Sequence, residues 1–262
     1  MDKTLRTAST GLTAQQRYVE IISHNIANVN TSGFKKVRPE FQDLLYETLR
    51  PSGANRYSNV EPLNEVQIGS GTELTATTKI FSQGDLQGTN NKFDLGINGE
   101  GFFQIRKPDN SIAYTRDGSF HLDKNGQIVT SQGYQLEPGF VVPQDAVDFQ
   151  ITRDGQVSII LADRVTEQTL GQIELARFIN PAGLHSMGDN LYGETPASGI
   201  ALSEIPGMNN TGEVIQNHLE ASNVNIVDEM VNMITAQRAY ELNSKSVNTA
   251  DTILGTAVNL KR

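Results

Sequence analysis

Apolar residues recur at alternating steps of three and four positions along both ends of the chain. This spacing places them on one stripe of an α-helix, as in a coiled coil. Near the start the stripe consists of Leu5, Ala8, Leu12, Val19, Ile22, Ile26 and Val29, with Gln15 in step. Near the end it consists of Ile226, Met230, Met233, Tyr240, Val247, Leu254 and Val258, with Gln237, Ser244 and Asp251 in step. The pattern predicts a helix at each end, each with a heptad-like apolar seam that polar residues interrupt.

The second helix has a clear start. Asn225 is a suitable N-cap, and Asp228 and Glu229 fall in the first turn, where negative charge is favourable. Lys261 and Arg262 suit the last turn.

Between residues 73 and 219 the apolar runs become short and turn residues separate them. The segment 120–129 has two such runs around Asn125-Gly126, a dipeptide that favours a two-residue hairpin turn. Further strands are expected at 93–105, 112–116, 134–142, 147–152, 156–162 and 169–179. The string TRDG occurs at 115–118 and again at 152–155. Two hairpin turns of similar chemistry explain it, with an internal duplication as the alternative.

Residues 34–72 separate the first helix from the strands. Pro, Gly, Ser and Asn are frequent over 50–65 and break long elements. Residues 180–218 are similarly rich in Gly, Asn and Pro, and we expect loops with short strands there. The predicted fold class is α+β: residues 1–33 and 220–262 form a terminal helical domain, 34–72 an extended connector and 73–219 a β-rich domain.

Neither terminal helix can cover its apolar seam alone. We therefore expect the ends of the chain to come together, and our hypothesis is that they become ordered only when several copies pack. The alternative is an intramolecular helix pair that docks on the β-rich domain.

The composition limits the function classes. The 262 residues include no cysteine, which excludes disulfides and thiolate metal sites. The net charge is −9, and it resides in the middle, because residues 1–30 carry +1 and residues 220–262 carry −1. An acidic middle argues against a nucleic-acid partner, and nearly neutral ends allow copies to meet without strong repulsion. We expect no membrane insertion and no cleaved signal peptide, since the chain has no long apolar run.

No motif predicts chemistry. The four histidines are far apart, so a zinc site is not expected. Ser32 and Lys35 match S-x-x-K, but no K-T-G accompanies them. Gly96, Gly99 and Gly101 lie outside a βαβ pattern, and Asp123 begins a turn that lacks the distal glutamate of a calcium loop. The sequence predicts no catalytic, cofactor-binding or metal-binding residue. A pair of glycosidase carboxylates stays open, because carboxylates are plentiful.

One stretch has a specific resemblance. Asn25-Ile-Ala-Asn28-Val-Asn-Thr31-Ser-Gly33-Phe34-Lys35 resembles the N-terminal signature of the bacterial flagellar rod and hook family. The similarity continues through FQDLLYETLRP (41–51), the segment 67–105, YTRDGSF (114–120) and the segment 219–245. The length and the connector after Tyr46 most resemble the distal rod members of the basal body, with proximal rod and hook members as alternatives.

The resemblance implies a structural protein rather than an enzyme. It implies that the terminal helices form an antiparallel coiled-coil pair (D0), that the β-rich middle forms an outer layer (D1), and that no cofactor is needed. Many copies would assemble helically into a stiff hollow rod that transmits torque to the hook, from the periplasm to the outer membrane. The implied partners are further copies, the proximal rod and hook proteins, the basal-body rings and the flagellar type III export apparatus, which exports subunits without a cleaved signal peptide.

The stretch 25–35 then acquires a structural interpretation. Asparagines are poor helix formers, so Asn25, Asn28 and Asn30 would end the helix where the chain turns outward. Gly33 would supply a backbone conformation that other residues resist, Phe34 would be buried, and Lys35 and Lys36 would stay in water. The expected assembly interface consists of Leu5, Leu12, Gln15, Val19, Ile22, Asn25, Ile26, Asn28, Thr31, Gly33, Phe34, Lys35, Ile226, Met230, Met233, Gln237, Tyr240, Val247 and Leu254.

Two further expectations concern mechanics and alternatives. In this family an extra segment in the connector is linked to a straight, stiff rod, so removal of residues 50–65 should give a polymer that bends. The alternative class is a secreted carbohydrate-active enzyme, which would need a cleft with paired carboxylates.

Overall fold

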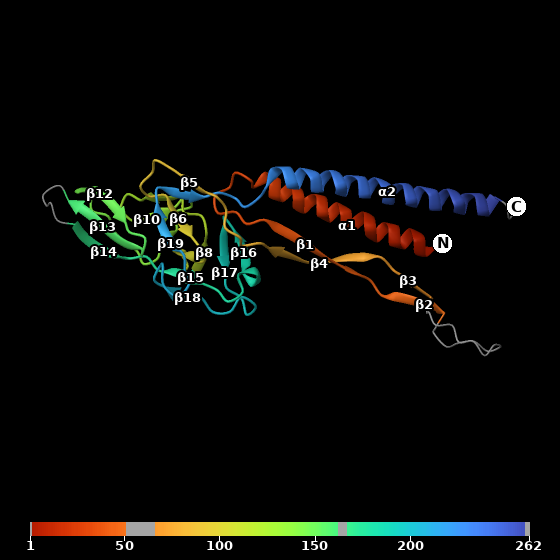
Figure 1. The fold of residues 1–262 in the computed structure, drawn as a ribbon, viewed down its shortest axis with the longest axis horizontal. Coiled ribbons are helices and arrows are strands. Elements are labelled where there is room, and N and C mark those ends of the chain that lie inside the picture. Colours follow the sequence, from red (N-terminus) through yellow and green to blue (C-terminus); the bar gives the residue numbers. More distant parts are fainter. Residues whose placement is uncertain (1, 51–65, 162–166, 260–262) are drawn as a thin grey trace. The chain divides into compact units, whose positions relative to one another are not determined.

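A computed structural model describes residues 2–50, 66–161 and 167–259 of the chain. Two helices enclose, in sequence, a region that is mainly β, so the fold class is α+β (Figure 1). By its internal contacts the chain divides into two units. The helical unit comprises Met1–Ile26, Val37–Thr78 and Asn225–Arg262, and the β unit comprises Ala27–Lys36 and Lys79–Val224.

The helical unit holds the two long helices, α1 (Asp2–Ala27) and α2 (Ile226–Asn259). The N-cap of α2 is as predicted, because Asn225 Oδ1 accepts a hydrogen bond from Val227 N at 3.0 Å. The same unit has two narrow ribbons of two strands, β1 (Val37–Asp43) with β4 (Thr72–Lys79), and β2 (Tyr46–Arg50) with β3 (Val66–Gly69).

The two ribbons occupy the described part of the expected connector. Residues 37–50 and 66–78 therefore pack with the helices as β-structure. Residues 27–33, expected with the first helix, and 34–36, expected in the connector, pack with the β unit. Backbone pairing explains the difference, because an extended segment that finds a partner strand satisfies its N–H and C=O groups. The proposed stiffening segment, residues 50–65, lies almost wholly outside the described residues.

The largest described sheet of the β unit runs through β16 (His185–Gly188), β17 (Leu191–Gly193), β8 (Ile112–Thr115), β7 (Phe102–Arg106), β11 (Gln135–Leu136), β10 (Ile128–Thr130) and β9 (Phe120–Leu122). β15 (Leu175–Arg177) joins it by pairing with β7 and with β18 (Leu202–Glu204). The other sheets are β12 (Ala146–Ile151), β13 (Gln156–Leu161) and β14 (Glu167–Gln172); β19 (Glu213–Gln216) with β6 (Leu95–Asn98); and β20 (His218–Glu220) with β5 (Leu86–Gly88). One short 3₁₀-helix spans Pro181–Gly183.

The core of the β unit has two parts. One is an aliphatic and aromatic cluster in which Phe103, Ile105, Phe120 and Leu175 are fully buried. The other is a group of aromatic rings, Phe81, Phe102, Tyr114, Phe178 and Tyr192, most of which meet edge to face. Burial of this apolar surface is what holds the short strands together.

The hairpin predicted at 120–129 is confirmed, although its turn is longer than two residues. β9 and β10 pair antiparallel, and Asp123 N donates to Gln127 O at 2.8 Å across three intervening residues. The second TRDG is also a hairpin turn, between β12 and β13. The first is not, because β8 and β9 do not pair with each other, and its Arg116 is buried. The shared letters therefore serve two different structures.

Candidate assembly surface

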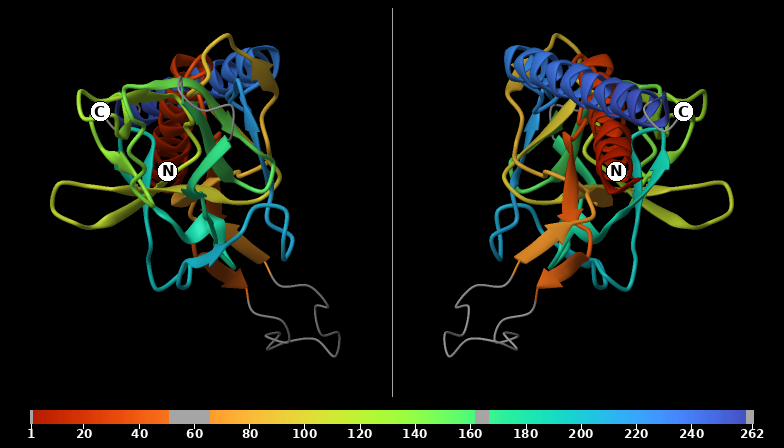
Figure 2. Two further views of the ribbon diagram at one scale, coloured as in Figure 1. Left: turned by 90° about the vertical axis from the view of Figure 1, so that its left-hand side faces the viewer. Right: turned by 90° about the vertical axis from the view of Figure 1, so that its right-hand side faces the viewer.

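The two helices lie side by side and antiparallel (Figures 1 and 2). Asn25 Nδ2 on α1 donates to Glu229 Oε2 on α2 at 3.0 Å. Nearer the far ends, a Cβ atom placed on Gly11 would lie 2.9 Å from Asn243 Nδ2. The residue numbers of both pairs add up to 254, so one register describes both contacts. Glycine at position 11 lets the helices approach there, since a side chain would meet Asn243.

On the α2 side, small and polar residues face α1. On α2 the inward column is Glu229, Ala236, Asn243 and Ala250, each seven residues after the last. Glu229 and Ala236 are 1% and 2% exposed. The chain's own helix pair is therefore built around a column that the apolar pattern did not single out. A seven-residue recurrence of small or polar residues is the signal that could have found it.

The apolar seam predicted on α2 faces a different direction from this column. Most of its apolar residues stand three positions before those of the column. Three residues turn a helix by about 300°, so the two faces are about 60° apart. Within the single chain Ile226, Met230, Gln237 and Tyr240 are exposed, and Met233, Val247 and Leu254 are half-buried. On α1, Ile22 and Asn25 are buried, and the remaining predicted positions are half-buried: Leu5, Leu12, Gln15, Val19 and Ile26. The structure thus brings the α1 residues under partial cover and leaves much of the α2 seam uncovered.

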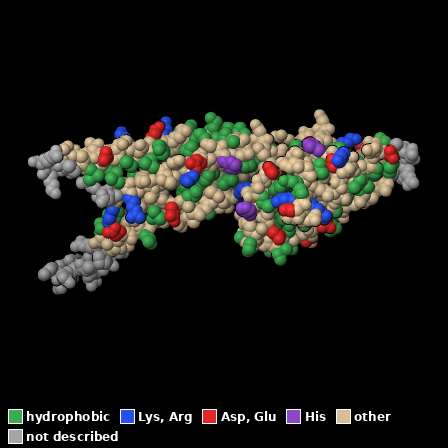
Figure 3. Space-filling model, turned by 180° about the vertical axis from the view of Figure 1, so that it is seen from behind, with side chains coloured by type: hydrophobic (Ala, Val, Ile, Leu, Met, Phe, Trp, Pro, Cys, Tyr) green, Lys and Arg blue, Asp and Glu red, His purple; other side chains and the backbone are tan. Residues whose placement is uncertain are grey.

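A second apolar stripe on α2 was missed by the sequence analysis. Val227, Val231, Ile234, Leu242 and Ile253 are each at least half exposed, with Leu242 at 67%. The helical part of the surface accordingly shows many hydrophobic side chains (Figure 3). An exposed apolar stripe on a helix is a candidate site of interaction with another molecule.

Between the helices lies an apolar groove of about 570 Å³. Val19 from α1 and Tyr240 from α2 supply its apolar wall, together with the stems of Gln16 and Gln237. Glu20 and Glu241 also line it, one from each helix. Arg17 Nη1 lies 2.8 Å from Glu20 Oε2, so one of these carboxylates already has a basic neighbour.

The turn after α1 is fixed by the β unit. Gly33 has φ +68°, the left-handed conformation expected of it. A Cβ atom there would lie 2.6 Å from the backbone of Arg116 and Asp117. Phe34 is 7% exposed, as expected. Asn28 and Thr31 are half-buried, and Thr31 Oγ1 donates to Asn28 Oδ1 at 3.2 Å. The turn is therefore tightly packed at Gly33 and Phe34.

The expectation that Lys35 stays in water is wrong. Its side chain is fully buried, and its Nζ atom lies 2.5 Å from Glu220 Oε1. Arg116 Nη1 lies 3.2 Å from the other oxygen of the same carboxylate. Gly84 N also donates to Glu220 Oε1, at 2.9 Å. Lys36 is half-buried, and its backbone N donates to Asn223 Oδ1.

Two buried cations therefore share one carboxylate. Burial lowers the pKa of Lys35, against the attraction of Glu220, and burial likewise lowers the pKa of Arg116. The charges are tolerated because hydrogen bonds satisfy the carboxylate. This cluster joins residue 35 to residue 220, so both segments that lead to the helices are anchored in the β unit.

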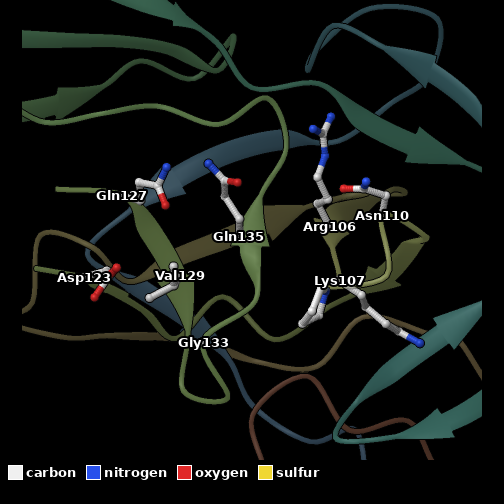
Figure 4. A pocket seen from close by; sticks show the side chains of 9 residues that line it. Arg106, Lys107, Asn110, Asp123, Gln127, Val129, Gly133 and Gln135 are labelled. Carbon is white, nitrogen blue, oxygen red and sulfur yellow. The ribbon is translucent and has the colours of Figure 1, made fainter. Parts of the chain in front are cut away.

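The β unit also has a polar cavity of about 410 Å³ beside β7, β10 and β11 (Figure 4). Arg106 and Asn110 lie on one side of it and Asp123 on the other. Asp123 is the only acidic residue among the described side chains that line it, whereas glycoside hydrolysis needs two carboxyl groups.

Within the part of the chain that the structure describes, no cluster of three or more His, Cys, Asp or Glu side chains has the geometry to hold a metal ion. Neither described helix combines the length and apolar character needed to span a bilayer.

Comparison with known proteins identifies the family. Residues 5–35 match the family model described as flagella basal body rod protein. Residues 96–159 match the flagellar hook protein FlgE/F/G D1 domain, and residues 215–260 match the flagellar basal body rod FlgEFG protein C-terminal.

Individual relatives agree. The chain is 49% identical to the flagellar basal-body rod protein FlgG of Borreliella burgdorferi, over 100% of both chains. It is 48% identical to FlgG of Buchnera aphidicola from Schizaphis graminum, over 94% of this chain and 95% of that one. The flagellar hook protein FlgE of Salmonella typhimurium is 41% identical, but over only 58% of this chain and 36% of that protein. The rod proteins thus match over their whole length and the hook protein does not.

Proposed function

Because the chain belongs to the flagellar basal-body rod family, of the FlgG type, we propose that it is the subunit of the distal rod. Copies assemble helically into a stiff, hollow shaft that carries torque to the hook. The terminal helices form the inner layer as an antiparallel coiled-coil pair, and the β-rich region forms the outer layer.

The observation that carries this proposal is the uncovered seam of α2. Within one chain, α2 faces α1 with Glu229, Ala236, Asn243 and Ala250. The apolar residues of the predicted seam, which we expect to pack, instead remain in contact with water. Full burial of a large apolar side chain contributes about 1.5–3 kcal/mol. Met230 and Tyr240 are 54% and 44% exposed, so each retains about half of that contribution for contact with another copy.

Replacement of a seam residue by aspartate tests the proposal. In Met233→Asp and Tyr240→Asp a charge enters the contact between copies, so polymer growth should stop while the β unit stays folded. Sedimentation and negative-stain electron microscopy measure the polymer, and near-ultraviolet circular dichroism reports the fold. Thr13→Asp is the matched control, because Thr13 is exposed on α1 and its hydroxyl bonds only to Ser9 O of its own helix. Normal polymers from both seam variants would refute the assembly role.

The family also supports proposals about partners and place. The subunit would contact the proximal rod, the hook and the surrounding rings, reach the periplasm and outer membrane through the flagellar type III export apparatus, and need no cofactor. Residues 50–65 would stiffen the rod. A chain that lacks them should still polymerise and should bend in micrographs, and a shortened polymer as straight as the parent would remove that role.

A further inference from the structure

We propose that a second copy of this chain inserts Leu242 into the groove between α1 and α2. The inference rests on the proposed polymer and specifies one of its contacts. It follows from two surfaces of the same unit that are complementary in shape and in charge.

The first surface is the groove itself. It has a volume of about 570 Å³, which exceeds the size of one aliphatic side chain, and Val19 and Tyr240 form its apolar wall. Glu20 and Glu241 stand on its two sides. Arg17 pairs with Glu20 and reduces the negative charge on the α1 side. The groove therefore suits an apolar side chain with basic neighbours.

The second surface is centred on Leu242, which is 67% exposed. Arg238 precedes it by four residues and Lys245 follows it by three, so both cations flank it on one face of α2. Both are exposed. An apolar side chain between two cations matches an apolar groove between two carboxylates, and such complementarity sets the register of an interface.

The two surfaces point in different directions. Leu242 comes five residues after Gln237, which lines the groove, and five residues turn an α-helix by about 140°. One copy can therefore fill the groove of a second copy while its own groove stays open. Contacts between unlike surfaces that do not close on themselves generate open chains rather than two-fold dimers. This property favours a further copy as the occupant over an unrelated helix.

Two variants test the contact without disturbing buried structure, because both positions are exposed. Leu242→Glu removes the inserted side chain and places a negative charge before Glu20 and Glu241. Gln237→Arg fills the groove and repels Arg238 and Lys245 of the incoming copy. Each variant should raise the critical concentration for polymerisation of the full chain about tenfold or more, as expected for loss of one buried leucine. Ile179→Glu is the control, since Ile179 is 83% exposed in the β unit and belongs to neither surface.

A mixture of the two variants separates this contact from general damage. The intact Leu242 of the Gln237→Arg chain fits the intact groove of the Leu242→Glu chain, and neither variant can make this contact with its own copies. An equimolar mixture should therefore polymerise at a lower total concentration than either variant alone. Analytical ultracentrifugation of each variant and of the mixture measures this. Wild-type growth by either variant, or a mixture whose critical concentration equals that of the single variants, would overturn the contact. Failure of the wild-type chain itself to polymerise would instead refute the proposed function.

Discussion

Replacement of Glu220 by glutamine tests the buried charge cluster. The substitution keeps the shape of the side chain and removes the negative charge on which Lys35 and Arg116 both depend. Glutamine would leave two cations buried without a counter-charge. Loss of one partner of a buried ion pair costs about 3–5 kcal/mol, because the remaining charge has lost its water and its partner.

The expected change in melting temperature follows from this free energy and from the size of the β unit. For a domain of roughly 150 residues, 1 kcal/mol corresponds to about 2–4 °C, so Glu220→Gln should lower Tm by about 6–20 °C. Thermal and urea unfolding of the full chain, followed by near-ultraviolet circular dichroism of the buried tyrosines, measures the change.

Lys35→Met provides the contrast within the cluster. It removes the surplus positive charge and leaves Arg116 and Glu220 as a neutral pair. The Ser82 carbonyl that accepts from Lys35 keeps a second donor, Asn223 Nδ2 at 3.0 Å. Its cost should therefore be smaller, about 1–3 kcal/mol.

Glu213→Gln is the surface control, since the side chains of Arg153 and Glu213 lie 3.8 Å apart and are 82% and 44% exposed. It should cost less than about 1 kcal/mol. The reasoning is wrong if Lys35→Met destabilises as much as Glu220→Gln, or if Glu220→Gln behaves like the surface control.

Three further predictions follow from the same structure. A non-glycine residue in the left-handed conformation costs roughly 1–2 kcal/mol of stability. Gly133→Ala, at φ +86° with open space around it, should cost only that amount, whereas Gly33→Ala should cost more, because its Cβ atom would meet backbone. Urea unfolding measures both variants. Burial raises the pKa of Tyr192 from 10.0 to about 12, so the folded state holds this proton more tightly and stability should fall by about 2–3 kcal/mol as pH rises from 10 to 12. Tyr192→Phe should flatten that slope, and an unchanged slope would contradict it; the lowered pKa of Lys35 acts with the opposite sign, and only below pH 10.5. In dilute wild-type chain, backbone amides of α1 and α2 should exchange with solvent faster than those of β7 and β13, and strong protection of both helices would count against their ordering by assembly.

Local sequence determined much of this protein. Period-three-and-four patterns located both helices, Asn225 marked the start of α2, and Asn125-Gly126 marked a hairpin. Gly33 was recognised as a residue with positive φ. These features depend on backbone preferences and on neighbours within a few residues, which is the information that a pattern along the chain contains.

Tertiary structure decided which surfaces those elements bury. Two adjacent lysines resemble a solvated turn. The buried position of Lys35 depends on Glu220, 185 residues further along the chain, and on the Ser82 carbonyl, both of which accept from its ammonium group. The same holds for Arg116, since one TRDG anchors the β unit and the other closes a hairpin. Likewise, the apolar pattern of α2 does not state which stripe faces α1. The close approach at Gly11 and the bond from Asn25 to Glu229 rotate the small and polar column inward, and so leave the apolar stripes for other molecules. Burial depends on residues that are distant in sequence, and a periodic pattern along the chain contains no information about them.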